Sequence, residues 1–269
     1  MNYLVIKCGG SVLEELPESF FENIVKIKKS GKWTPILVHG GGPLISEMLQ
    51  SLKIKTEFVD GLRVTSNEVL DVVEMVLTGV VNKKIVRKFL KVGGSAFGIS
   101  GVDGGFLRAK PVSNNSKLGF VGEVVEVKTN LLTQIIKTGY IPIVSPLGIS
   151  GDGQRYNING DAAAAAVAKS LKANLCMVSN IDGIFSWKDG EKVILDSITK
   201  NQAEELIKDG VIRDGMIPKV NSAIDALLKG VPEVTIVNGM NDNSLVDYCL
   251  GKKVGTKIVV GEESQIVYQ

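Results

Sequence analysis

Seven short runs of apolar and β-branched residues recur along the chain, with helical patterns between them. They cover residues 3–7, 35–39, 95–99, 141–145, 175–179, 234–237 and 257–260. Most of these runs are continuously apolar rather than alternating, which is typical of strands buried on both faces of a parallel sheet. The chain is therefore expected to be an α/β protein with a mainly parallel central sheet.

Helical patterns fill five of the intervals, at residues 17–30, 43–52, 68–92, 161–171 and 218–229. The alanines of residues 161–171 indicate close helix–sheet packing, and Asp161 suits a helix N-terminus. Residues 104–127 are expected to form hairpins that project from the sheet, and residues 148–155 a loop. The length of 269 residues favours one domain of two lobes, with a boundary near residue 173.

Charge, cysteine content and hydropathy argue against several classes of protein. The 31 basic and 29 acidic residues give a net charge of +2, so we expect no large basic face for nucleic acid. Three cysteines without metal-ligand spacing argue against a disulfide framework and a structural zinc site, and they fit a reducing compartment. Because no run of about 18 apolar residues occurs, we expect a cytoplasmic protein without a membrane anchor.

Two glycine-rich turns follow the first two predicted strands. Gly9 and Gly10 come shortly after Lys7, and residues 40–42 come directly after His39. Ligands of parallel α/β sheets bind at the carboxyl ends of the strands, where glycines expose backbone N–H groups to an anion. The glycines could also serve only as tight turns. His39 is expected to pack or to form hydrogen bonds rather than to act as a general base.

The common phosphate-binding motifs are absent, so an ATP site here would need a different cradle. Lys219 lies at a predicted helix start, where a cation is disfavoured unless an anion is nearby. Arg63 could hold a carboxylate in a bidentate fork or be an ordinary surface residue. Asn157, Asn159 and Asp161 could bind a ligand or only cap a helix.

Five segments together resemble the amino acid kinase family, in the family's order and over nearly the whole chain. They are Ile-Lys-Cys-Gly-Gly-Ser at 6–11, Val-His-Gly-Gly-Gly-Pro at 38–43, Gly-Leu-Arg-Val-Thr at 61–65, Asn-Ile-Asn-Gly-Asp at 157–161 and Gly-Met-Ile-Pro-Lys at 215–219. More closely, the segments resemble those of the family members that phosphorylate N-acetyl-L-glutamate in arginine biosynthesis. The resemblance implies a three-layer αβα sandwich with an open, mainly parallel sheet.

The resemblance also implies an active site. Residues 1–173 would form an N-terminal lobe for amino-acid binding and dimerisation, and residues 174–269 a C-terminal lobe that binds ATP. The Mg²⁺ of the nucleotide would be held mainly by the phosphates, without a metal site on the protein. Lys7 and Lys219 would stabilise the transferring phosphoryl group, and Asp161 would hold both lysines. The backbone N–H groups of Gly10 and Gly41 would contact phosphoryl oxygens. The amino-acid substrate would lie against Gly41, Gly42, Arg63, Asn157 and Asn159. The nucleotide would lie against Lys7, Gly9, Gly10, Ser179, Asn180, Gly183, Gly215, Met216 and Lys219.

Two positions depart from the family pattern. Asn180 stands where aspartate is common, and Asp214 where glycine is common, which affects the expected adenine and ribose contacts more than catalysis. A kinase of a related carboxylate, such as a carrier-linked aminoadipate, is one alternative. A non-catalytic amino-acid sensor on the same fold is another, although the presence of both lysines and of Asp161 favours an active enzyme.

Residues 69–77 are apolar on more than one helical face, which a helix covering a sheet does not need. We expect the surplus to be buried in a homodimer or, alternatively, beneath the hairpins of residues 104–127. The resemblance also points to a dimer. Arginine-inhibited hexameric members carry a helix ahead of the first strand, which here is predicted to begin near residue 3, so we expect little inhibition by arginine.

Overall fold

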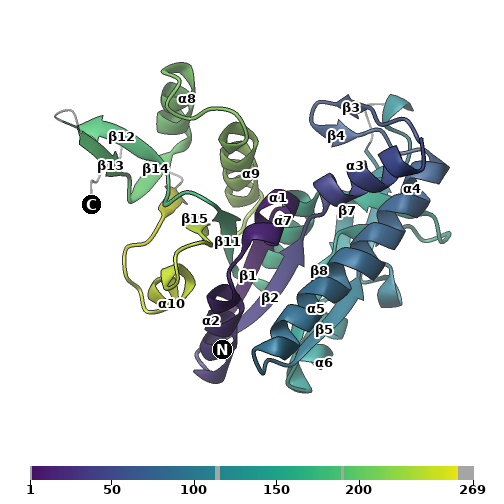
Figure 1. Ribbon diagram of the computed structural model, residues 1–269, viewed down its shortest axis with the longest axis horizontal. Coiled ribbons are helices and arrows are strands. Elements are labelled where there is room, and N and C mark those ends of the chain that lie inside the picture. The colour runs from purple at the N-terminus through teal and green to yellow at the C-terminus, as the bar shows by residue number, and fades with distance from the viewer. Residues whose placement is uncertain (1, 113–115, 189–190, 260–269) are drawn as a thin grey trace.

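An eight-stranded sheet forms the centre of the computed structural model, which describes residues 2–112, 116–188 and 191–259 (Figure 1). The strand order is β14-β16-β15-β11-β1-β2-β8-β5. Neighbouring strands are parallel except for the antiparallel pair β15–β16. The prediction of a mainly parallel sheet is confirmed.

All seven predicted strands belong to this sheet. They are β1 (Asn2–Cys8), β2 (Trp33–His39), β5 (Ala96–Ser100), β8 (Ile141–Ser145), β11 (Asn174–Ser179), β15 (Val234–Asn238) and β16 (Thr256–Val259). Residue 260, the predicted end of the last strand, lies outside the described residues. The sequence did not predict β14 (Ser197–Thr199), because three residues are too few to show a pattern.

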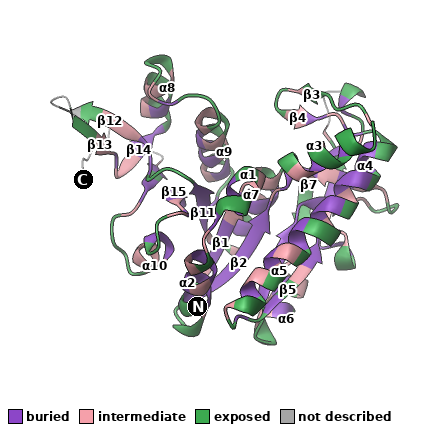
Figure 2. Cartoon of the chain, in the orientation of Figure 1, coloured by how far each residue is buried: buried purple, intermediate pink, exposed green. Residues whose placement is uncertain are grey.

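Helices cover both faces of the sheet and complete the three-layer αβα sandwich. One face carries α6 (Thr129–Lys137), α7 (Gly160–Leu171), α8 (Lys200–Lys208) and α9 (Met216–Leu228), and the other carries α1 (Gly10–Glu15), α2 (Glu18–Lys29), α3 (Gly42–Ser51), α4 (Asn67–Glu74), α5 (Asn82–Lys91) and α10 (Ser244–Cys249). Figure 2 shows burial in the central strands and on the helix sides that face them. No helix among the described residues has both the length and the apolar character needed to cross a membrane.

The side chains of β1 alternate between the two cores, which explains its continuously apolar sequence. Leu4 and Ile6 belong to the core on the α2 side, whereas Val5 belongs to the core on the α7 side. Successive residues of a strand point to opposite faces. Lys7, two residues after Val5, therefore leaves the strand on the side of α7.

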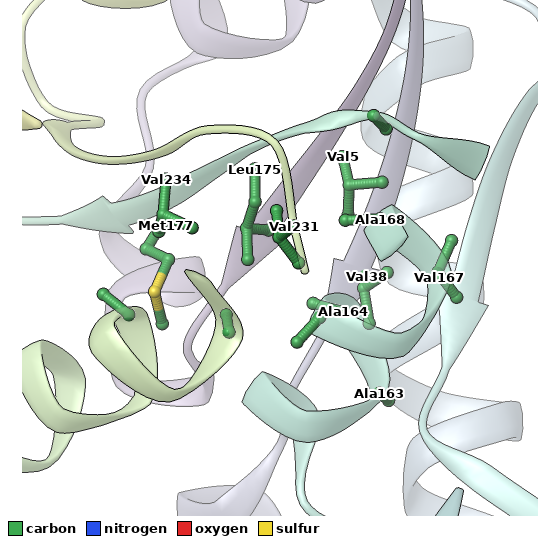
Figure 3. Close-up of a cluster of buried hydrophobic side chains, with 14 of the residues drawn as sticks. Val5, Val38, Ala163, Ala164, Val167, Ala168, Leu175, Met177, Val231 and Val234 are labelled. Atoms are coloured by element: carbon green, nitrogen blue, oxygen red, sulfur yellow. The ribbon is translucent and has the colours of Figure 1, made fainter. Parts of the chain in front are cut away.

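The alanines of α7 bring this helix close to the sheet, as predicted. Ala164 and Ala168 are fully buried, and Figure 3 shows them against Val5 of β1 and Val38 of β2. The small side chains let the helix backbone approach the strands closely. The N-terminus of α7 is thereby held near the carboxyl ends of β1 and β2.

A second sheet differs from the prediction. β6 (Leu107–Pro111) and β7 (Val121–Val127) form the antiparallel hairpin expected within residues 104–127, of which 113–115 lie outside the described residues. β9 (Leu147–Ile149) and β10 (Arg155–Ile158) join them to close a four-stranded barrel. The prediction of a loop at residues 148–155 is correct for residues 150–154, which form the turn of a β9–β10 hairpin. It is wrong for Gly148, Ile149 and Arg155, which lie in the two strands.

The sequence analysis also did not predict two short hairpins. β3 (Phe58–Val59) and β4 (Leu62–Arg63) are joined by Asp60 and Gly61, whose φ angles are 50° and 76°. Positive φ at both positions is the type I′ turn, which Asp-Gly favours, so this sequence signal was available. The other hairpin pairs β12 (Phe185–Lys188) with β13 (Glu191–Ile194).

The long helix predicted at residues 68–92 consists of α4, a π-helical segment (Met75–Val81) and α5. The apolar residues of the stretch at 69–77 are 3% exposed or less, except Met75. They are buried within the chain, where α4 packs against α3 and β10. Most of this surplus is therefore covered by the chain itself rather than by a second subunit, whereas Met75 is 57% exposed and stays on the surface. The homodimer stays a prediction.

Candidate active site

The candidate residues gather where the central strands end. β1 lies between β2, which leads to one half of the sheet, and β11, which leads to the other. A switch of this kind in strand order opens a crevice at the carboxyl ends of parallel strands. In Figure 1, α1 and α7 lie at the middle of the molecule, between its two halves.

An ion pair joins the end of β1 to the start of α7. Lys7 Nζ lies 2.7 Å from Asp161 Oδ1, and the two side chains are 11% and 21% exposed. Asn159 Oδ1 caps α7 by accepting hydrogen bonds from the N–H groups of Asp161 at 2.8 Å and Ala162 at 3.2 Å. The cap is therefore made by Asn159, and the carboxylate of Asp161 is available to pair with a lysine.

Lys219 approaches the same point from the first turn of α9. Its Nζ donates to the carbonyl oxygen of Val178, near the end of β11, at 3.2 Å. Burial and the charge of Lys7 lower the pKa of Lys219 to about 8, and the negative charge of Asp161 opposes this shift. Asp161 thus contacts Lys7 directly and acts on Lys219 by longer-range attraction.

The two glycine turns touch each other. The N–H of Gly40 donates to the carbonyl oxygen of Cys8 at 2.9 Å. A Cβ atom on Gly10 would lie 2.9 Å from the backbone of Gly41, and one on Gly41 would lie 2.7 Å from a side-chain carbon of Leu77. Glycine at position 10 therefore allows the two turns to come this close beside Lys7, and glycine at position 41 leaves room for Leu77.

His39 supports the second glycine turn, as expected. It is fully buried, its Nδ1 donates to the carbonyl oxygen of Gly40 at 2.9 Å, and its Nε2 lies 3.0 Å from Ser145 Oγ. Burial lowers the pKa of His39 to about 4. The imidazole is therefore neutral at pH 7 and is held away from solvent, which does not suit a general base.

Two cavities meet at the ion pair. The smaller, about 270 Å³, is lined by every residue predicted to bind the amino-acid substrate, namely Gly41, Gly42, Arg63, Asn157 and Asn159. The larger, about 560 Å³, is lined by most of the residues predicted to bind the nucleotide, namely Lys7, Gly9, Ser179, Asn180, Gly183, Gly215, Met216 and Lys219. Gly10 lines only the smaller cavity, and both cavities share Lys7, Gly9, Ser11 and Asp161.

Arg63 lines the smaller cavity and has an unsatisfied donor. Its Nη2 donates to the carbonyl oxygen of Gly42 at 3.1 Å and to Ser46 Oγ at 2.8 Å, and its guanidinium lies 4.7 Å from the ring centroid of Phe58. Nη1 is buried without a partner. A buried donor of this kind is costly unless a ligand satisfies it, and a carboxylate fits a guanidinium best. The sequence analysis did not identify Phe58 or Ser46.

Ser179, which lines the larger cavity, also has an unsatisfied polar atom. The hydroxyl of Ser179 is buried without a partner, and the exposed Asn180 follows it. Asp214 has a φ of 50°, a left-handed conformation that accounts for the glycine expected at this position. Among the described residues, no group of three or more acidic, histidine or cysteine side chains is arranged to hold a metal ion.

Comparisons with known proteins agree with this geometry. The sequence model of the "Amino acid kinase family" matches residues 2–238. The acetylglutamate kinase of Oceanobacillus iheyensis is 49% identical over 99% of this chain and 100% of its own length, and that of Bacillus velezensis is 47% identical over 97% and 98%. The crystal structure of smu.665 from Streptococcus mutans UA159 superposes with a TM-score of 0.78 at 31% identity, covering 96% of this chain and 98% of that one.

The pKa of Lys219 predicts how anion binding depends on pH. The protonated lysine attracts phosphate, and the free protein loses this proton as the pH rises through about 8. Affinity for a non-hydrolysable ATP analogue should be constant below pH 8 and should fall above it by up to about tenfold per pH unit. Isothermal titration calorimetry measures this profile. Lys219→Arg should abolish the fall, and an unchanged slope in that variant would contradict the assignment.

Proposed function

The chain belongs to the amino acid kinase family, and we infer that it uses ATP to phosphorylate the side-chain carboxylate of N-acetyl-L-glutamate. The product is N-acetyl-L-glutamyl 5-phosphate, and the step belongs to arginine biosynthesis. The curated relatives support this substrate along the full length of the chain. The geometry supports it through the two cavities that share Lys7 and Asp161.

The wall that the two cavities share, which includes Lys7 and Asp161, is the main support for the proposal. A substrate in the smaller cavity and a nucleotide in the larger one would direct their reacting ends toward Lys7. The carboxylate is already a nucleophile, so the reaction needs no general base. It needs alignment and positive charge around the phosphoryl group. Lys7, Lys219 and the backbone N–H groups of Gly10 and Gly41 supply these.

The amino-acid substrate would bind in the smaller cavity. Arg63 would bind its α-carboxylate through the unpaired Nη1, while Asn157 and the turn at residues 41–42 would contact the rest of the molecule. Asn159 would support this wall through its cap of α7. Arg63 is 7% exposed, so a carboxylate bound there would be shielded from solvent.

The nucleotide would occupy the larger cavity, with Ser179 at its floor and Gly215 and Met216 beside the start of α9. Its Mg²⁺ would be held mainly by the phosphates. Residues 174–269 would thus form an ATP-binding lobe, and residues 1–173 a lobe for the amino acid. A cytoplasmic location fits three cysteines that are all free and a biosynthetic role.

A coupled ADP-release assay tests the proposed function. ADP should form from MgATP only when N-acetyl-L-glutamate is added. Release with an aminoadipate derivative instead would favour the related carboxylate kinase. Binding of N-acetyl-L-glutamate without any release of ADP would favour the sensor.

Both lysines should act on the chemical step. Lys7→Ala or Lys219→Ala should lower kcat by at least about a hundredfold, the scale of one lost transition-state donor. Circular dichroism should show a folded protein in each case. Lys32→Ala, a change to an exposed lysine at the opposite end of the sheet, is the control. Near-normal turnover in a folded variant would remove that lysine from the mechanism.

Arg63 should act on the amino-acid substrate. Arg63→Ala should raise the KM for N-acetyl-L-glutamate strongly and the KM for ATP only slightly. A loss of about 1.5–3 kcal/mol is expected for a charged hydrogen bond. Arg87→Ala, at an exposed arginine of α5, should change neither value. Equal weakening of both substrates would contradict the assignment.

We propose a homodimer that associates through the surface around the outer strand β5. β5 is an outer strand of the sheet, and its Phe97 is 47% exposed. Phe97 forms a T-shaped pair with Tyr140, itself 41% exposed, with the ring centroids 6.0 Å apart. Apolar outer strands are commonly covered, because they present unpaired backbone groups and apolar surface.

The mass in solution checks this proposal. Light scattering with size exclusion should give twice the 28.8 kDa of one chain. Phe97→Glu should shift the protein toward the monomer because it places a charge on the outer strand. The corresponding change at Trp187, an aromatic residue 61% exposed on β12, should leave the mass unchanged. A wild-type monomer at micromolar concentration would reject the dimer.

A further inference from the structure

We propose that Thr65 is a positioning residue that fixes which end of the Asn157 side-chain amide is available to the substrate. This inference rests on the proposed function, since it concerns how the smaller cavity reads an N-acylated amino acid. Thr65 lies two residues after Arg63 and is fully buried. It does not line either cavity, so it would act through its neighbours.

The hydroxyl of Thr65 lies between two groups that belong to the cavity wall. It donates to the carbonyl oxygen of Arg63 at 2.7 Å, and it accepts from Asn157 Nδ2 at 3.1 Å. A threonine hydroxyl has one proton to donate, and a carbonyl oxygen can only accept. Because the proton is used toward Arg63, the Thr65 oxygen can only accept from Asn157.

These two hydrogen bonds of Thr65 fix the orientation of the Asn157 side-chain amide. Asn157 must present its NH₂ group to Thr65, which leaves its carbonyl oxygen Oδ1 for the cavity that it lines. No donor in the described part of the chain contacts that oxygen. Rotation of the amide by half a turn would bring Oδ1 against the Thr65 oxygen, where two acceptors would face each other.

The result is a complementary pair of groups on one wall. Asn157 offers an acceptor, and Arg63 offers its unpaired Nη1 donor. An N-acylated α-amino acid carries a donor N–H and a carboxylate on the same carbon atom. Thr65 thus directs Asn157 Oδ1, an acceptor, toward the N–H of the substrate. Its hydrogen bond to the carbonyl oxygen of Arg63 also holds the segment that carries the guanidinium.

The main chain around Thr65 is held independently of its side chain. The N–H of Thr65 donates to the carbonyl oxygen of Leu118 at 2.9 Å, and its carbonyl oxygen accepts from the N–H of Phe120 at 2.7 Å. The carbonyl oxygen of Phe120 in turn accepts from the N–H of Asn157 at 2.9 Å. A valine at position 65 would keep all three bonds and would remove only the hydroxyl.

Steady-state kinetics of three variants test the inference. Thr65→Val should raise the KM for N-acetyl-L-glutamate by about tenfold and leave the KM for ATP within about twofold. Thr65→Ser keeps the hydroxyl and should restore most of the affinity. Thr138→Val, which removes a hydroxyl at the end of α6, should change neither KM. Thr65→Ala replaces Thr65→Val in the comparison if circular dichroism shows that the valine variant does not fold.

A double-mutant cycle with Asn157→Ala separates positioning from a general structural effect. If Thr65 acts through Asn157, most of the effect of Thr65→Val on the KM should disappear in the Asn157→Ala background. Additive effects, an unchanged KM in Thr65→Val, or equal losses for both substrates would overturn the inference. Inactivity of the wild type toward N-acetyl-L-glutamate would instead count against the proposed function.

Discussion

The ion pair between Lys7 and Asp161 joins the parts of the molecule on which the site depends. Lys7 lies one residue before the end of the central strand β1, and Asp161 lies in the first turn of the helix that covers it, so the 2.7 Å contact ties the sheet to α7. Lys219 reaches the same point from α9 and experiences both charges, which act on its pKa in opposite directions. The carboxylate of Asp161 thus helps to hold the two lysines near each other. Their positive charges would offset the repulsion between a polyphosphate and a carboxylate substrate.

The backbone geometry around this pair is as restrictive as its charges. A Cβ atom on Gly10 would lie 2.9 Å from the backbone of Gly41, and one on Gly41 would lie 2.7 Å from a side-chain carbon of Leu77. His39 holds the second turn from within the core, and burial keeps its imidazole neutral. Lys7, Lys219 and Asp161 thus bring charge to the walls of the cavities, while His39 behind the second turn is uncharged and hydrogen-bonded.

Burial decides which apolar residues are available for association. The stretch at 69–77 has more apolar surface than a helix covering a sheet needs, yet α3, β10 and the sheet cover all its apolar side chains except Met75. Phe97 instead remains exposed, although its strand alone gave no reason to single it out. A helical pattern records how many faces are apolar but not which elements pack on them, because those elements come from distant parts of the chain.

The sequence by itself determined seven of the eight strands of the main sheet, the alanine-rich helix and the set of residues around Lys7, since these depend on local composition and on short motifs. The closed barrel, the internal burial of α4 and the short strand β14 were decided only by tertiary structure, because they depend on long-range pairing. The same distinction holds within the site. The segment Gly-Leu-Arg-Val-Thr identified Arg63, but only the fold placed Phe58 on its guanidinium and the Thr65 hydroxyl between Arg63 and Asn157. Hydrogen bonds between residues 92 positions apart leave no local signal in a sequence.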